Sequence, residues 1–158
     1  MTYKIDSLSH DDLVNLLSTA TYGNSDAIDI DVPEECMEFY VGECWEDKLA
    51  NVLLNGGRIE VIDRYSEEHP DDYETYGEQG KNWISTRWQE FTSWNREEQG
   101  QWGNVVYTID LNNILYGINQ NDHTNKLAHE LLINEDGDLY TAYNLLQCIV
   151  FGGEEIYG

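Results

Sequence analysis

Positive charge is scarce in this chain. Lys and Arg number 8 against 31 Asp and Glu, which gives a formal net charge of -23 at pH 7. Proteins that bind nucleic acid directly use Lys and Arg to neutralise its phosphates. We therefore expect no direct contact with nucleic acid. Self-repulsion on this scale destabilises a compact state, so the charge indicates a function that requires it.

Long apolar runs are also missing. No stretch approaches the roughly 18 apolar residues that a membrane-spanning helix needs, so we expect no membrane association. The first residues, Met-Thr-Tyr-Lys-Ile-Asp, lack the apolar stretch of a signal peptide. The cysteines are only Cys36, Cys44 and Cys148, without a C-x-x-C motif, which favours free thiols in a reducing cytoplasm. Cys44 and Cys148 are expected in the core, on the apolar stripes of helices.

Familiar catalytic motifs are incomplete or missing. His129 and Glu130 resemble the start of the zinc-protease motif H-E-x-x-H, but Ile133 occupies the place of the second histidine. The sequence has no P-loop, no G-x-S-x-G and no recognisable Cys–His arrangement. We therefore expect a protein that is not an enzyme, with no catalytic residues and no cofactor.

Carboxylates offer two weaker candidates for a metal site. Three residues have calcium-loop spacing, namely Asn134, Asp136 and Asp138, but the glycine and the closing glutamate of that loop are absent. Asp29 and Asp31 point to one face of an expected strand, with Asp26 nearby. With 31 acidic residues, carboxylates will pair by chance, so neither candidate is taken as a metal site. An enzyme with a carboxylate-bound metal is the second alternative to a non-enzymatic binding protein.

The stretch 43–63 is expected to form the centre of the core. Its apolar stripe has the helical spacing i, i+4, i+7 and i+8, at Trp45, Leu49, Val52 and Leu53. Gly56 and Gly57 then end the helix, because glycine readily takes the left-handed conformation that closes a helix. Residues 58–63 alternate in polarity, which predicts a strand.

The rest of the chain predicts an α+β fold in a single domain over residues 1–158. A small sheet should pack against two or three helices. Helices are expected at 9–21, capped by Ser9 with Asp12, and at 112–120 and 140–151, with a short helical turn within 34–42. Strands are expected at 27–32 and 105–111. Residues 83–98 show helical spacing, residues 126–133 favour a strand and a turn, and about 64–82 form a polar acidic loop.

The acidic residues are unevenly distributed. Residues 26–78 contain 17 acidic and three basic residues, and residues 135–158 contain five acidic residues and no basic one. Spread over roughly 8,000 Å² of surface, the net charge gives about one per 350 Å². Duplex DNA carries about one charge per 110 Å². Concentrating the charge on one face would bring its density close to that of DNA, so DNA mimicry is physically feasible. The simpler alternative is a generally acidic, soluble protein.

The segment 65–78 is the expected partner-binding surface. It interleaves carboxylates with tyrosines, at Glu67, Glu68, Asp71, Asp72, Tyr73, Glu74, Tyr76 and Glu78. Carboxylates suit the Arg and Lys of a basic partner, and tyrosines add contact area at low entropic cost. The partner expected from this composition is a basic, nucleic-acid-binding protein.

Four of the five tryptophans lie between residues 83 and 102. Core packing is the simpler interpretation of this cluster. An exposed aromatic patch that binds another protein is the alternative, and it would make the chain an ordinary interaction module.

Three stretches carry a resemblance to other proteins. They are Cys44-Trp45-Glu46-Asp47-Lys48-Leu49-Ala50, Leu53-Leu54-Asn55-Gly56-Gly57 and the C-terminal Phe151-Gly152-Gly153-Glu154-Glu155-Ile156-Tyr157-Gly158, which resemble small acidic proteins carried on Bacteroidales mobile elements. That group has no established activity, so the resemblance implies no site residues. It implies a setting of gene transfer and host defence, in which antirestriction and anti-CRISPR proteins are often acidic DNA mimics.

Overall fold

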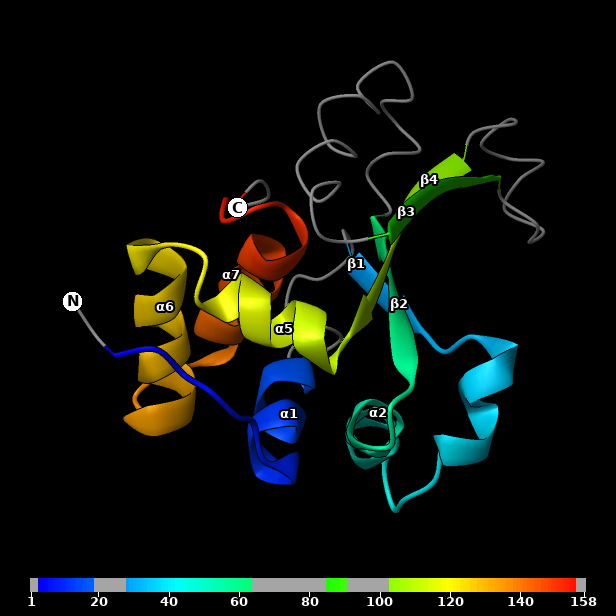
Figure 1. Cartoon of the computed structure of the whole chain (residues 1–158), viewed down its shortest axis with the longest axis horizontal. Coiled ribbons are helices and arrows are strands. Elements are labelled where there is room, and N and C mark those ends of the chain that lie inside the picture. The colour runs from blue at the N-terminus through cyan, green and yellow to red at the C-terminus, as the bar shows by residue number, and fades with distance from the viewer. Residues whose placement is uncertain (1–2, 19–27, 64–84, 91–102, 156–158) are drawn as a thin grey trace.

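The computed structural model describes residues 3–18, 28–63, 85–90 and 103–155. They form a four-stranded antiparallel sheet, in the order β1 (Ile28–Asp31), β2 (Arg58–Asp63), β4 (Gly103–Asp110) and β3 (Ser85–Glu90). The helices are α1 (His10–Leu17), the 3₁₀ helix η2 (Glu34–Phe39), α2 (Trp45–Leu54), α5 (Leu111–Ile118), α6 (Asp122–Ala128), the π-helix η5 (His129–Ile133) and α7 (Leu139–Val150) (Figure 1). The expected α+β class is confirmed, with more helices than the two or three expected.

The first helix begins where the sequence predicts. Ser9 precedes α1 with extended backbone, and its hydroxyl accepts a hydrogen bond from the Asp12 amide at 3.1 Å. The Asp12 carboxylate in turn accepts one from the Ser9 amide at 2.8 Å. This reciprocal capping box satisfies two amides that the first turn would otherwise leave unpaired. Leu13, Leu16 and Leu17 then form the buried face of α1.

Removing this cap gives a direct test of the interaction. Ser9→Ala should lower the free energy of unfolding by about 1 kcal/mol, because alanine cannot accept the Asp12 amide hydrogen. Urea denaturation measures the change. Ser7→Ala is the matched control, since Ser7 is exposed and precedes the cap. Equal destabilisation by both substitutions would contradict the capping role.

The central stretch 43–63 folds as expected. α2 buries Leu49, Val52 and Leu53. It ends before Gly56, whose φ of 84° lies in the left-handed region that glycine adopts most readily. β2 then alternates, with Ile59, Val61 and Asp63 buried and the intervening residues half-buried.

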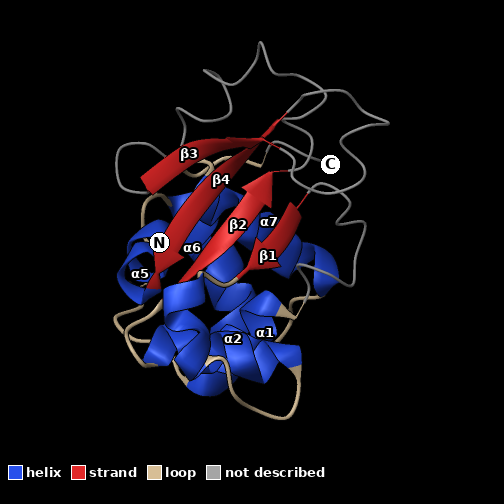
Figure 2. Ribbon diagram, turned by 90° about the vertical axis from the view of Figure 1, so that its right-hand side faces the viewer, coloured by secondary structure: helices blue, strands red, loops and turns tan. Residues whose placement is uncertain are grey.

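The strand register separates two faces of the sheet. Val61 of β2 lies opposite Ile30 of β1 and Tyr107 of β4, and this row belongs to the apolar core. Asp29, Asp31 and Glu60 lie on the other face, since successive side chains of a strand alternate. Figure 2 shows the strands in front of the helices, so the helices cover one face.

α7 is the helix around which the helical layer packs. It contacts α1, α5 and α6, and most of its residues are buried, including Leu145, Leu146 and Ile149. Its last turn reaches the sheet through Phe151, whose ring packs edge-on against Tyr107 with centroids 5.5 Å apart. None of the helices in the described part of the chain has the length and apolar character that crossing a bilayer requires.

The expected strand at 126–133 is wrong. α6 continues directly into η5, so this segment is helical. A short apolar run does not distinguish a buried strand from a buried helix. Here Leu131 and Leu132 are buried, and the Leu131 carbonyl accepts a hydrogen bond from Asn15 of α1 at 3.1 Å. Packing against helices therefore decides the conformation.

The helical spacing at 83–98 also misleads over residues 85–90. These residues form β3, which pairs antiparallel with β4 and places Trp88 opposite Val105. Three apolar positions with helical spacing are weak evidence beside a continuous ladder of backbone hydrogen bonds. Thr86 and Trp88 also favour strands intrinsically.

Candidate functional site

The predicted partner-binding residues lie outside the part of the chain that the structure describes. This holds for the whole segment 65–78, and also for Trp83, Trp94 and Trp102 of the tryptophan cluster. The binding role of Glu67, Glu68, Asp71, Asp72, Tyr73, Glu74, Tyr76 and Glu78 therefore stays a prediction.

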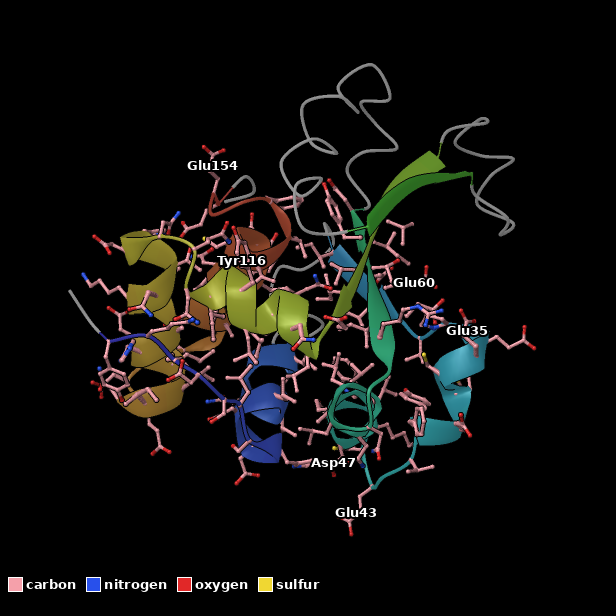
Figure 3. All side chains as sticks on the ribbon, in the orientation of Figure 1. Glu35, Glu43, Asp47, Glu60, Tyr116 and Glu154 are labelled. Carbon is pink, nitrogen blue, oxygen red and sulfur yellow. The ribbon has the colours of Figure 1, made fainter. Side chains whose placement is uncertain are left out.

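The described residues contain an acidic surface that follows β1. We call it the acidic edge, and it consists of Asp31, Glu34, Glu35, Glu38 and Glu43, all of them exposed. Residues i and i+3 of a 3₁₀ helix project on the same side, so Glu35 and Glu38 stand roughly 6 Å apart along the axis of η2. Figure 3 shows Glu35 and Glu43 on a different side of the molecule from Glu154.

Packing holds the acidic edge in place. Cys36 is the buried residue of η2, which turns the neighbouring glutamates outward. Arg58 of β2 pairs with Glu35, and Asn51 of α2 donates a hydrogen bond to the Val41 carbonyl at 2.6 Å. The edge is thus anchored to both α2 and β2.

Two apolar side chains accompany the acidic edge. Met37 is 46% exposed and Val41 is 57% exposed, although both belong to the same segment as the glutamates. An apolar side chain surrounded by charged ones resembles the anatomy of a protein interface, in which a polar rim surrounds an apolar centre.

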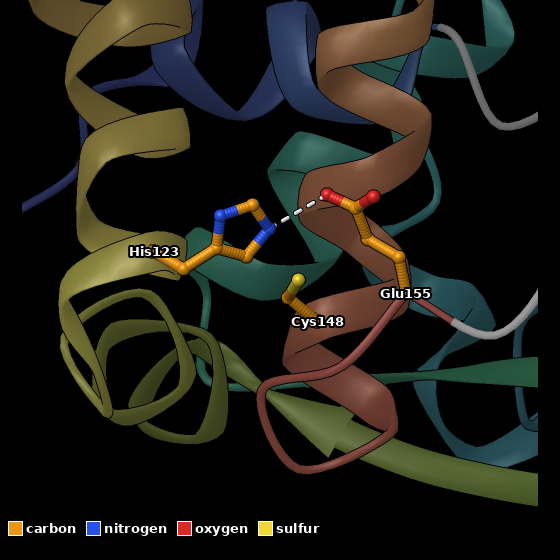
Figure 4. Close-up of side chains that lie close together, drawn as sticks. All are labelled: His123, Cys148 and Glu155. Carbon is orange, nitrogen blue, oxygen red and sulfur yellow. Dashed lines mark hydrogen bonds and ion pairs between the residues drawn. The ribbon is translucent and has the colours of Figure 1, made fainter.

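A second group of polar side chains lies where the start of α6 meets the end of α7. His123 lies in the first turn of α6, Cys148 lies in the last turn of α7, and Glu155 follows that helix. Their nitrogen, sulfur and oxygen atoms lie within 4.8 Å of one another, and we call them the His–Cys–Glu cluster. His123 Nε2 lies 2.8 Å from a carboxylate oxygen of Glu155 (Figure 4).

Backbone and amide contacts bring the elements of this cluster together. Gln120 donates a hydrogen bond to the Cys148 carbonyl at 2.8 Å, and Asn121 donates one to the Gly153 carbonyl at 3.2 Å. Gly153 has a φ of 94°, and a Cβ atom there would lie 2.3 Å from the Asn121 side-chain nitrogen. Only glycine therefore allows the turn after α7 to approach the start of α6 this closely.

The environment of Cys148 keeps its thiol protonated. Burial is the main cause that raises its pKa to about 11; the negative charges of Glu155 and Glu154 contribute to this rise, and the Thr124 hydroxyl opposes it. Reactive cysteines have the opposite property, a lowered pKa and access to solvent. The thiol of Cys148 is therefore not an activated nucleophile.

The expectations for the cysteines hold in part. Cys36 and Cys148 are buried and all three thiols are free, but Cys44 is exposed. Cys44 occupies the N-cap position before α2, without a side-chain capping hydrogen bond, instead of lying on the apolar stripe, so its expected place in the core is wrong. A hydrogen bond with the Glu46 side chain is the main cause that raises the pKa of Cys44.

The fragments of metal motifs have structural roles. His129 is 4% exposed, and its Nε2 lies 2.7 Å from the Tyr3 carbonyl, so it ties the N-terminal segment to η5. Asp138 caps α7 by accepting a hydrogen bond from the Thr141 amide, which lowers its pKa. Asp29 and Asp31 share one face of β1, while Asp26 lies outside the described residues.

Sequence reasoning missed the His–Cys–Glu cluster. His123 and Glu155 stand 32 positions apart, and no motif has the spacing of the three residues. Gly152 and Gly153 are the one usable signal, since glycines directly after a helix favour its end and a turn. Comparisons with protein-family models, curated proteins and solved structures find no match for this chain.

Proposed function

We propose that this chain is a non-enzymatic acidic binding protein that occupies the basic, nucleic-acid-binding surface of another protein. Its mechanism is competition: carboxylates take the places that phosphates fill when that partner binds DNA. An antirestriction or anti-CRISPR role on a mobile element would fit this mechanism and the resemblance of residues 44–50, 53–57 and 151–158.

The observation that carries the proposal is the acidic edge. Five carboxylates occur within residues 31–43, and all of them are exposed. Carboxylates form strong charge-assisted hydrogen bonds with Arg and Lys. Complementary charge also raises the rate of association and disfavours acidic partners.

Met37 and Val41 support a protein partner in particular. Burial of their exposed side chains would add an apolar contribution that free phosphate or a small cation cannot provide. The predicted segment 65–78 would add further carboxylates, interleaved with tyrosines, to the partner-binding surface.

The test is a pull-down from host-cell lysate at low salt, with elution at high salt and identification of the captured proteins. Surface ion pairs are screened strongly as the Debye length falls from about 30 Å at 0.01 M to about 8 Å at 0.15 M salt. The proposal requires DNA-binding proteins that elute with salt and that DNA displaces. A partner that resists salt would contradict it and favour the tryptophan region as an interaction module.

A second variant tests the predicted segment separately. Glu67, Glu68, Asp71, Asp72 and Glu74 are replaced together by Gln or Asn. Unchanged binding of the captured partner would remove this segment from the proposed surface.

A further inference from the structure

We propose that His123, Cys148 and Glu155 form a binding site for one Zn²⁺ ion. The inference is separate from the proposed function and rests on the geometry of the His–Cys–Glu cluster. The three side chains come from α6, from α7 and from the turn after α7, and they converge on one point (Figure 4).

The spacing of the ligand atoms is close to what zinc requires. Zinc bonds of about 2.0–2.3 Å in tetrahedral geometry place ligand atoms roughly 3.3–3.8 Å apart. The atoms of the cluster lie within 4.8 Å of one another, so the widest pair must approach by about 1 Å. His123 and Glu155 are already 2.8 Å apart, and a metal ion would replace this hydrogen bond.

The ligand types select zinc among the common divalent ions. Thiolate and imidazole are ligands of Zn²⁺, whereas Ca²⁺ and Mg²⁺ prefer oxygen alone. Zn²⁺ binding displaces the thiol proton of Cys148 to solvent, and the resulting thiolate and the carboxylate of Glu155 together balance the double positive charge of the ion. Three protein ligands leave the fourth tetrahedral position to water.

The same three residue types also occur in nucleophilic triads, but the arrangement here differs. In a triad the two histidine nitrogens serve different partners, the nucleophile and the acid. In this cluster Nε2 of His123 bonds with Glu155, and the same side of the ring faces the Cys148 sulfur (Figure 4). The three groups therefore face a common centre, which suits coordination of an ion.

Thr124 provides an independent observation. Its side chain is fully buried, and within the described residues its hydroxyl oxygen has no hydrogen-bond partner at ordinary geometry. The hydroxyl nevertheless lies close enough to Cys148 to lower the pKa of that thiol. A thiolate bound to zinc would accept the hydrogen of this hydroxyl, and such outer partners orient metal ligands.

The ion could enter from solvent without rearrangement of the core. The side chains of His123 and Glu155 are 56% and 33% exposed, whereas Cys148 is buried. The two exposed ligands can therefore move toward the fixed sulfur.

The experiment titrates the full chain with Zn²⁺, and separately with Co²⁺, in excess Mg²⁺ that occupies unspecific carboxylates. We expect one equivalent of Zn²⁺, a higher melting temperature, and with Co²⁺ a sulfur-to-metal charge-transfer band. Removal of a ligand, by Cys148→Ala, His123→Ala or Glu155→Gln, should weaken binding on the order of 100-fold or more, because even outer partners contribute 10–100-fold. Thr124→Val should weaken it about tenfold.

Two matched variants serve as controls. Asp136→Asn removes an exposed carboxylate outside the cluster, and Cys44→Ser removes the exposed thiol, and both should bind Zn²⁺ as the parent does. Circular dichroism of each variant confirms that it folds, and the surface substitutions His123→Ala and Glu155→Gln keep the test valid if Cys148→Ala does not fold. Absence of binding, or a Co²⁺ band that survives in Cys148→Ala, would overturn the proposal.

Discussion

Phe151→Ala should lower the free energy of unfolding by about 3–5 kcal/mol. Phe151 is 1% exposed and follows the last residue of α7. Its ring meets Tyr107 of β4 edge-on, at an interplanar angle of 79°, and so joins the helical layer to the sheet. Alanine would bury less apolar surface and would lose the aromatic contact with Tyr107. It would also leave a cavity, around which packing contacts are lost.

Denaturation with guanidinium, followed by circular dichroism, measures this loss. Tyr140→Ala is the matched control, because Tyr140 is an aromatic residue near the start of the same helix and is 62% exposed. Surface substitutions usually change stability by no more than about 0.5 kcal/mol. A comparable loss in the two variants would show that Phe151 does not join the two layers.

Neutralising the acidic edge should slow association with the captured basic partner about tenfold or more at low ionic strength. The variant combines Asp31→Asn, Glu34→Gln, Glu38→Gln and Glu43→Gln, and leaves Glu35 paired with Arg58. Stopped-flow or surface plasmon resonance gives the association rate. The difference from the parent should shrink as salt is added, because screening removes long-range attraction.

The control for this prediction changes the same number of charges elsewhere. Asp6→Asn, Asp122→Asn, Glu135→Gln and Asp136→Asn alter exposed residues that do not belong to the acidic edge. If overall charge alone drives association, the two variants will slow equally and the assignment of the surface fails. If the edge binds the partner, only the first variant will slow strongly.

Predictions from sequence succeeded where neighbours along the chain decide the conformation. The Ser9 and Asp12 pair starts α1, and Gly56 follows the end of α2, because each depends on contacts within about one helical turn. The alternation of residues 58–63 also predicted the strand β2, since an alternating pattern depends only on neighbours along the chain.

The failures share a cause in long-range packing. Residues 85–90 become a strand because β4 offers a hydrogen-bonding edge, and residues 129–133 stay helical because α1 packs against them. The prediction for Cys44 is wrong because the helix begins one residue later. Cys44 directly precedes Trp45, the first residue of α2 and of its apolar stripe, so one position separates the N-cap from the stripe.

The sequence by itself determined the acidic character of this protein, the α+β class, and the starts and ends of several elements. Net charge is a sum over residues, and helix caps and hydrophobic periodicity depend on neighbours along the chain. All three can therefore be inferred without the tertiary structure. Only the tertiary structure decided that His123, Cys148 and Glu155 meet and that all five carboxylates of the acidic edge are exposed. Those arrangements depend on how α6 and α7 pack and on which side of η2 is buried, and distant contacts set both.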